Sequence, residues 1–225
     1  DSILKQLVEE MHRAAFEPKY RKRSLGLPTV EGWDNRLKAY FWPNPACNYP
    51  FTCVSLQGLT EESQKLANTL ENNGKWTADE GRAAVVLANN IFVWGGVPQK
   101  PKTVTAKTVE QVFRDAFDAN SESTALMNSG WTKVAAFATA HLETPGSFRT
   151  QVIWDSRVAT AIIGRLDSIL NKWQNQNPRS LFPGIGTVPG QGGTRPREFL
   201  HKWPVGYRQW SAQISGSKIV RQLRD

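Results

Sequence analysis

Apolar side chains recur every three or four residues along most of the chain, which is the spacing of one face of an α-helix. Capping and stop signals give the predicted helices approximate ends. The predicted helices cover residues 1–16, Thr60 to the sequence NNG, the stretch from the Thr77–Glu80 capping box to Gly95–Gly96, the stretch after a second capping box at Thr108 and Gln111, Ser121 to the sequence MNSG, 132–143, Asp155 to Trp173, and 210–223. No segment shows the convincing alternation of apolar and polar residues that a half-buried strand would have. The pattern therefore predicts an all-α fold.

Three segments interrupt this helical pattern. The sequence YRKRS at 20–24 is predicted to be a short basic turn. Residues 31–58 are rich in aromatic residues, Pro and Asn, and are predicted to form an ordered loop with few regular elements. Residues 177–197 are rich in Gly and Pro and are predicted to be a second long loop. There is neither an internal repeat nor a low-complexity tail. The 225 residues are enough for one large domain or for two lobes that share a core, and residues 1–225 are expected to form a single functional unit.

The distribution of charge narrows the class of partner. The chain has a net charge of +8, and most of it lies near one end. Residues 172–225 carry nine Lys or Arg residues against two Asp or Glu residues. Such a basic segment predicts a polyanionic partner, either nucleic acid or an anionic membrane surface.

Composition argues against several other classes of protein. No apolar run is long enough to span a membrane. The three histidines and two cysteines show no spacing typical of a metal site, and Cys47 and Cys53 are expected to be reduced thiols. The expectation is a soluble, intracellular protein that holds no metal.

The sequence SGWTKVAAFATAHL at 129–142 places one lysine in an otherwise apolar helix. A helix that is apolar on all sides is typical of a protein interior. Burial and the positive end of the helix dipole would both lower the pKa of Lys133, and a neutral amine is a nucleophile. In the alternative interpretation, Lys133 extends from the helix end into solvent and has only a structural role.

Asp155 follows the apolar sequence VIW and immediately precedes a predicted helix. One interpretation is a simple helix cap, which is common and stabilising. The other is a carboxylate that backbone N–H groups keep ionised, so that it can stabilise a developing cation. Taken alone, Lys133 and Asp155 each fit a structural role better, and only the pair points to catalysis.

Together, the sequences SGWTKVAAFA and VIWDSRVATAI resemble the core of the helix-hairpin-helix DNA glycosylases, with the 8-oxoguanine DNA glycosylases as the nearest branch. In that superfamily a hairpin ending in Gly leads to Thr-Lys-Val, whose lysine is the nucleophile, and an Asp begins a following helix. The matching residues are Gly130, Thr132, Lys133, Val134 and Asp155. The sequence NNIFVWGGV at 89–97 also looks like a helix end of bacterial relatives. The hairpin LMNSGWTK departs from the family, because it has one glycine where a standard phosphate-binding hairpin has two.

The resemblance implies two helical lobes flanking a DNA-binding cleft, lobe one at about 60–170 and lobe two from 1–58 plus 172–225. It implies double-stranded DNA containing a modified base as the partner, an everted target nucleotide and no cofactor. Asp155 would stabilise positive charge at C1′ of the sugar, while Lys133 would attack C1′, displace the base and allow a Schiff-base lyase step. If Lys133 is only structural, Asp155 could instead position a water for base removal without lyase activity.

Two substrates agree with this resemblance. One is oxidised guanine, removed in DNA repair. The other is glucosylated hydroxymethylcytosine of phage DNA, which is removed by small prokaryotic glycosylases of antiviral defence that the chain also resembles. The single-glycine hairpin and the polar-aromatic segment at 31–58 suit a bulky base, so the second substrate is slightly favoured. A monomer in the cytoplasm of a prokaryotic cell is expected.

Further contacts are expected from cations and aromatic residues elsewhere. Phosphate contacts are predicted for Gly130, Arg157, Arg195, Arg197, Lys202 and Lys218. The sequence FPGIG at 182–186 is a weak candidate for a second phosphate loop. The aromatic tail residues Trp203, Tyr207 and Trp210 either stack on bases or pack beneath the tail. Residues predicted to lie near the excised base, each with a structural alternative, are Trp33, Asp34, Trp42, Asn44 and Trp94.

Two rival functions remain at the level of the sequence. The first is a non-catalytic DNA-binding module that keeps the fold and binds DNA even without Lys133 and Asp155. The second is a helical protein that binds RNA or a membrane surface, in which the Lys133–Asp155 pair would be a coincidence.

Overall fold

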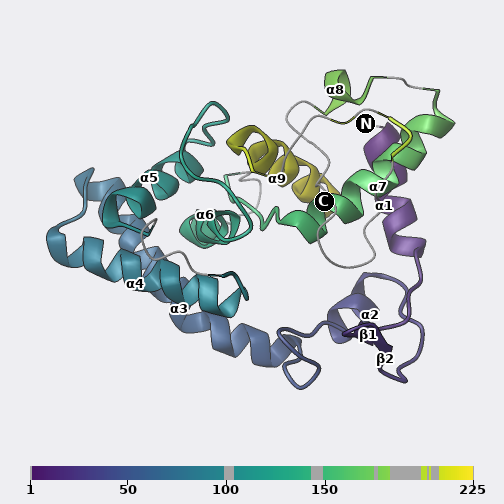
Figure 1. Ribbon diagram of the computed structural model, residues 1–225, viewed down its shortest axis with the longest axis horizontal. Helices are drawn as coiled ribbons and strands as arrows, with labels where there is room; N and C mark the ends of the chain where they lie inside the picture. The colour runs from purple at the N-terminus through teal and green to yellow at the C-terminus, as the bar shows by residue number, and fades with distance from the viewer. Residues whose placement is uncertain are drawn as a thin grey trace. The chain divides into compact units, whose positions relative to one another are not determined.

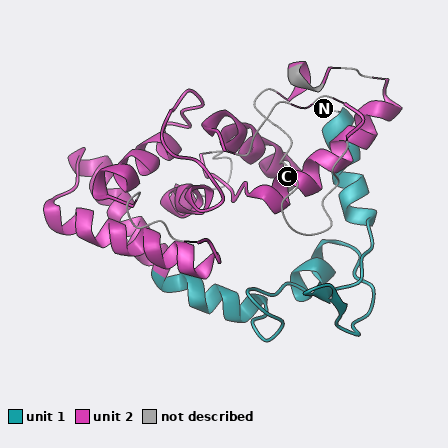
Figure 2. Cartoon of the chain, in the orientation of Figure 1, with its two compact units in different colours: residues 1–58 teal, residues 59–225 magenta. Residues whose placement is uncertain are grey.

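The chain divides into two compact units, drawn in different colours in Figure 2: unit 1 comprises residues 1–58 and unit 2 comprises residues 59–225. Residues after Lys172, which the resemblance assigned to a lobe with 1–58, belong to unit 2 in this division. A computed structural model describes residues 2–98, 104–142, 149–174, 177–182, 199–201, 203 and 208–224.

Unit 1 begins with the predicted amphipathic helix and continues through a small hairpin (Figure 1). The predicted basic turn is the two-residue turn of this hairpin, between β1 and β2. The boundary between the two units falls inside α3. The elements that begin in unit 1 are α1 (Ser2–Arg13), β1 (Lys19–Tyr20), β2 (Arg23–Ser24), α2 (Trp33–Lys38) and α3 (Tyr49–Asn73).

The regular elements among the described residues of unit 2 are all helices, and α4, α5 and α6 pack against one another (Figure 1). The long helix α7 and the last helix α9 follow the predicted bounds closely. The elements of unit 2 after α3 are α4 (Ala78–Trp94), α5 (Ala106–Phe117), α6 (Trp131–Thr139), the 3₁₀ turn η2 (Ala140–Leu142), α7 (Ser156–Lys172), α8 (Pro178–Leu181) and α9 (Trp210–Arg224).

The helix α6 is buried on nearly all sides, as its apolar sequence predicts. Eight of its nine residues are buried, and Lys133 is among them. Aromatic rings of α4 pack edge to face on α6: the ring centroids of Phe92 and Trp131 lie 5.1 Å apart, and those of Trp94 and Phe137 lie 5.9 Å apart. The lysine therefore belongs to the interior of unit 2.

Several predicted helix ends are confirmed. Thr77 and Glu80 form both hydrogen bonds of a capping box at the start of α4. Gly95 caps the end of this helix, and Gly96 follows with a left-handed φ of 61°. The sequence NNG also ends α3, where Gly74 has a φ of 69°.

The prediction of a largely irregular segment over 31–58 is wrong. α2 lies in this segment, and α3 begins at Tyr49, so that Thr60 is an interior residue of α3 rather than its cap. The Asn48 side chain accepts a hydrogen bond from the Phe51 N–H group at 3.1 Å and caps the helix instead. The proline in the first turn does no harm, because its missing N–H group would have no intrahelical partner there.

The predictions around Thr108 and Ser121 are also wrong. Thr105 caps α5, and the Gln111 side chain donates to Asp115 rather than closing a capping box. No helix begins at Ser121: the described residues 118–130 contain turns and bends but neither helix nor strand. The buried carboxylate of Asp115 accepts hydrogen bonds from Asn120 and Ser123 and holds this loop in place.

The described residues are mostly helical, and among them regular strands occur only in the two-residue strands of the β1–β2 hairpin. The prediction of a helical fold is therefore confirmed at this level. Within the described part of the chain, no helix has the length and apolar character needed to cross a membrane.

Candidate active site

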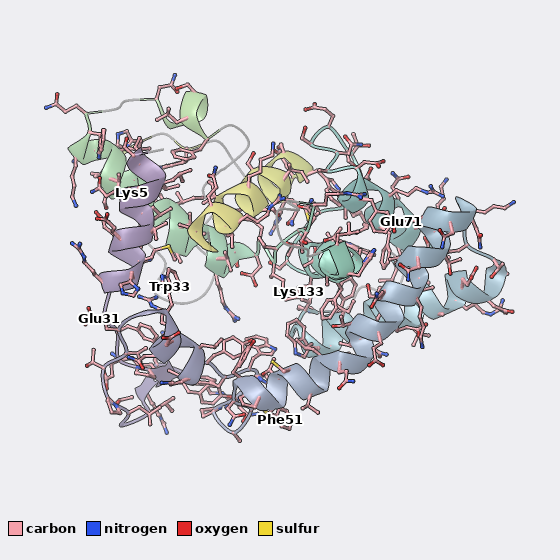
Figure 3. The ribbon with its side chains drawn as sticks, turned by 180° about the vertical axis from the view of Figure 1, so that it is seen from behind. Lys5, Glu31, Trp33, Phe51, Glu71 and Lys133 are labelled. Carbon is pink, nitrogen blue, oxygen red and sulfur yellow. The ribbon has the colours of Figure 1, made fainter. Side chains whose placement is uncertain are left out.

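Two helices of unit 2 bring Lys133 and Asp155 into contact. Lys133 lies in the first turn of α6, and Figure 3 labels it there. Asp155 is the N-cap residue of α7. The Lys133 Nζ atom lies 3.2 Å from Asp155 Oδ2, and the two side chains are only 7% and 16% exposed. The sequence-predicted pair is thus a nearly buried, charged pair.

The carboxylate of Asp155 is held by its own helix. Its Oδ1 atom accepts hydrogen bonds from the backbone N–H groups of Arg157, at 2.9 Å, and Val158, at 3.2 Å. This leaves Oδ2 for Lys133. The cap interpretation and the charge-stabilising interpretation are therefore compatible, because each uses a different oxygen atom.

Two groups besides Asp155 position the lysine side chain. Lys133 Nζ donates a hydrogen bond to the carbonyl oxygen of Ser129 at 2.7 Å. The aliphatic stem of Lys133 passes against Gly95, where an added Cβ would lie 2.6 Å from Cδ and 2.8 Å from Cε. Gly95 has an ordinary φ of −73°, so the space it leaves, rather than its backbone freedom, is what the lysine uses.

The surroundings of the pair lower both pKa values. Burial lowers the pKa of Lys133, and it outweighs the opposing effect of the Asp155 carboxylate. Burial by itself raises the pKa of Asp155, but the charge of Lys133 and the two N–H donors outweigh it, so this pKa lies below its ordinary value. A lysine that loses its proton more easily lies beside a carboxylate that stays ionised.

Replacing Gly95 by Ala should displace the lysine without unfolding the protein. The new methyl group would push the Lys133 stem away from Gly95 and move Nζ from Asp155 Oδ2. For the base-release reaction that the resemblance implies, we expect the single-turnover rate to fall by about 10²-fold, since a misplacement of about 1 Å can cost that much. Gly58→Ala is the matched control, because a Cβ at Gly58 meets nothing within 4 Å. Equal rates for the two variants would contradict this role for Gly95.

A buried hydrogen-bond network fixes the two backbones that carry the pair. The Thr132 Oγ1 atom accepts a hydrogen bond from the backbone N–H group of Trp154 at 2.7 Å and donates one to Gln213 Oε1 at 2.6 Å. Thr132 directly precedes Lys133, and Trp154 directly precedes Asp155. One side-chain hydroxyl thus joins the two segments next to the catalytic candidates.

The last helix supports the same network. Gln213 of α9 donates to the Val152 carbonyl oxygen at 2.8 Å, and Ser217 Oγ accepts from the Val152 N–H group at 3.1 Å. A Cβ added to Gly216 would overlap the indole ring of Trp154, so the helix and this segment are in direct contact. α9 therefore stabilises the position of the residues that precede Asp155.

Thr132→Val should lower the free energy of unfolding by about 1–3 kcal/mol. The variant keeps the shape but removes the hydroxyl, which leaves the buried Trp154 N–H group and the Gln213 side chain without this partner. Thr132→Ser keeps the hydroxyl and loses one buried methyl group, which costs about 0.5–1.5 kcal/mol. Urea unfolding followed by circular dichroism measures both. A Val variant as stable as the wild type would argue against a structural role for the hydroxyl.

The hairpin before α6 differs from the predicted phosphate contact. The backbone N–H groups of Gly130 and Trp131 both donate to the Asn128 Oδ1 atom, at 2.8 and 3.2 Å. An added Cβ on Gly130 would lie 2.8 Å from the Phe92 ring, so this glycine serves close packing. In this conformation the Gly130 N–H group is not turned toward an external phosphate, because a side chain of the hairpin itself accepts its hydrogen bond.

The other predicted residues of unit 2 lie at different depths. Arg157 is exposed in the first turn of α7, and its charge contributes to the lowered pKa of Lys133. Trp94 is half-buried and packs on Phe137. Lys218 is exposed on α9. Of these three residues, Arg157 is the one whose charge affects the pKa of Lys133.

Four predicted base-contacting residues belong to unit 1. The guanidinium of Arg36 lies 5.3 Å from the centre of the Trp33 ring, which is 39% exposed. Asp34 is exposed in the first turn of α2. Trp42 is half-buried, and Asn44 accepts a hydrogen bond from the Ala46 N–H group in a local turn. Their predicted role at the base stays a prediction.

The basic tail is only partly described. Arg195, Arg197 and Lys202 lie outside the described residues, as do Tyr207 and all of the sequence FPGIG except Phe182. Trp203 and Trp210 are buried, and Trp203 Nε1 donates to Asp167 Oδ1 at 2.8 Å. For these two tryptophans the packing alternative is therefore the correct one.

Sequence reasoning missed the residues that position the pair: Asn128, the Ser129 carbonyl, Gly95, Gln213 and Ser217. The GG pair at 95–96 appeared only as a helix stop, and no local signal marks a glutamine as the partner of a distant threonine. Among the described residues, no group of three or more His, Cys, Asp and Glu side chains is placed to hold a metal ion.

Comparisons of the chain with protein-family models, with curated proteins and with solved structures gave no match.

Proposed function

We propose that this protein is a DNA glycosylase in which Lys133 and Asp155 break the bond between a modified base and its sugar. The observation that carries the proposal is the nearly buried Lys133 ammonium, 3.2 Å from a carboxylate that caps the next helix. The resemblance of the two sequence segments to helix-hairpin-helix glycosylases adds the identity of the reaction. Double-stranded DNA is the proposed partner, and the net charge of +8 favours it.

The proposed step is a displacement at C1′ of an everted nucleotide. The neutral Lys133 amine forms a bond from Nζ to C1′ while the bond from C1′ to the base nitrogen breaks. The base leaves with the electron pair of that bond and takes a proton from solvent. Positive charge that develops on the sugar is stabilised by the Asp155 carboxylate. Nζ then loses a proton and forms a double bond to C1′ as the C1′–O4′ bond of the sugar ring breaks; O4′ keeps the electron pair of that bond and takes up a proton, which leaves a protonated Schiff base.

The burial of the pair supports this chemistry in two ways. A lowered pKa increases the fraction of Lys133 that is neutral and nucleophilic near neutral pH. A carboxylate with a lowered pKa keeps its negative charge, and in a partly buried site that charge acts more strongly on a nearby cation than it would in water.

Free-base release from a panel of DNAs tests the proposal and identifies the substrate. The panel contains unmodified DNA, DNA with oxidised guanine, and phage DNA with hydroxymethylated or glucosylated cytosine, and mass spectrometry detects the released bases. We expect release of one modified base, with glucosylated hydroxymethylcytosine slightly favoured over 8-oxoguanine. DNA binding without release from any of these DNAs would instead favour a non-catalytic DNA-binding module.

The pH dependence of Schiff-base formation should follow the lysine. On DNA that already contains an abasic site, the initial rate of formation of the borohydride-trapped adduct is expected to rise with pH, with its midpoint below 10.5, the ordinary pKa of lysine. Asp155→Asn removes a charge that favours protonated Lys133, so the midpoint should move to lower pH. A midpoint at 10.5 in the wild-type protein would contradict the lowered pKa.

A further inference from the structure

The β1–β2 hairpin of unit 1 concentrates positive charge that the catalytic proposal does not use. Its strands pair Lys19 with Ser24 and Tyr20 with Arg23, and Arg21 and Lys22 form the turn. The cationic side chains of Lys19, Arg21, Lys22 and Arg23 are all exposed. Four cations within five residues thus lie on one small, solvent-exposed ribbon.

The backbone of the turn is unfavourable for the residues that occupy it. Arg21 has a φ of 49° and Lys22 a φ of 69°, both in the left-handed region. A two-residue hairpin turn with two positive φ angles favours Asn-Gly, because glycine has no Cβ and asparagine tolerates the left-handed region better than long side chains do. The chain instead keeps two long cations at the tip, which is the pattern expected where function opposes stability.

The acidic side chain that contacts the hairpin, Glu17, leaves most of this charge unneutralised. Glu17 accepts a hydrogen bond from Ser24, and its carboxylate lies 3.5 Å from Lys19 Nζ. These contacts lower the pKa of Glu17, so it remains ionised, but it engages the base of the hairpin rather than the tip. The charges of Arg21, Lys22 and Arg23 therefore remain available to a polyanion.

We infer that Arg21, Lys22 and Arg23 of this hairpin bind the phosphate backbone of double-stranded DNA, as a contact separate from the Lys133–Asp155 pair. The inference requires a DNA partner but no base excision, so it goes beyond the proposed function. Long cations on a ribbon bind phosphates without reading the sequence.

Aromatic contacts at the hairpin favour duplex DNA over other anionic surfaces. Tyr20 is the only aromatic residue of the hairpin. The ring of Phe41 packs against the Tyr20 ring with the centroids 6.1 Å apart, and the Arg21 guanidinium lies over the Tyr20 ring, 5.2 Å from its centroid. The tip therefore offers no free ring for stacking, which single-strand binding sites generally use. It also offers no exposed apolar side chain that would enter a membrane.

The test measures the affinity of the full-length protein for an unmodified, fluorescein-labelled 20-base-pair duplex by anisotropy at several salt concentrations. The hairpin variant is Arg21→Gln/Lys22→Gln/Arg23→Gln. The control, Arg13→Gln/Lys65→Gln/Arg82→Gln, removes the same charge from cations whose exposed ion pairs already neutralise them. We expect the hairpin variant to bind at least about 10-fold more weakly and to lose about 0.9 from the salt slope for each phosphate contact removed. The control should stay within about 2-fold of wild type, because it removes no phosphate contact.

A second variant separates binding from folding. Arg21→Asn/Lys22→Gly places the favoured residues in the turn, so its melting temperature should equal or exceed that of wild type while its DNA affinity falls. Wild-type affinity of both hairpin variants, or an equal loss in the control, would overturn the inference. The same variants are also measured for binding to anionic phosphatidylserine vesicles and to single-stranded DNA. A loss of affinity confined to either of these would likewise overturn the inference. Base release is measured in a separate assay. A protein that releases no base but binds DNA would therefore still test this inference.

Discussion

Lys133→Ala is expected to abolish the borohydride-trapped adduct with DNA, including DNA that already contains an abasic site. The variant removes Nζ of Lys133, the atom proposed to form the covalent bond to the sugar. The expected loss of base release on the true substrate is at least about 10³-fold, as for removal of other enzymatic nucleophiles. Gel electrophoresis of the trapped complex and single-turnover kinetics measure the two effects.

Two control variants separate nucleophilic from structural roles of Lys133. Lys133→Arg keeps a positive charge beside Asp155 but supplies no nucleophilic amine at neutral pH, so it should also fail to form the adduct. Lys107→Ala removes an exposed lysine of α5 in the same unit and should leave activity unchanged. Adduct formation by Lys133→Arg at the wild-type rate would show that another residue is the nucleophile.

We expect Asp155→Asn to impair base release while leaving the nucleophile in place. The asparagine oxygen can still accept from the Arg157 and Val158 N–H groups, so α7 keeps its cap. The negative charge near the sugar is lost, and base release should fall by about 10²–10³-fold, as when one charge-stabilising group is removed from other enzymes.

The same variant should retain adduct formation on abasic DNA, because that reaction no longer requires a bond to the base to break. The contrast between the two DNAs assigns charge stabilisation to Asp155 and bond formation to Lys133. Asp79→Asn, an exposed carboxylate in the first turn of α4, is the control. Loss of both activities together with a lower melting temperature would reduce Asp155 to a structural cap.

The ends of a helix were predictable where the capping or stop residues lie at that end in the sequence. The Thr77–Glu80 box and the Gly95–Gly96 end are local in sequence, and the structure keeps them. The start of α3 was missed because Pro50 and Gly58 are usually helix breakers, whereas one lies in the first turn and the other is accommodated within a long helix. The helix predicted from Ser121 is absent because the Asp115 carboxylate binds the side chains of this loop.

The contact between Lys133 and Asp155 was predictable in part, from the apolar helix, the cap position and the resemblance. The residues around the pair were not, because their contacts join segments far apart in the chain. Thr132 and Gln213 are 81 residues apart, and nothing local at either position indicates the other. Gly95 is likewise defined by the lysine stem that fills its space, which only the packed structure reveals.

The most direct test of the central claim is to trap the protein on its substrate DNA with borohydride, digest the complex and identify the modified peptide by mass spectrometry. We expect a single adduct on the Nζ atom of Lys133. Base release without any trapped adduct, or an adduct on a different lysine, would contradict it.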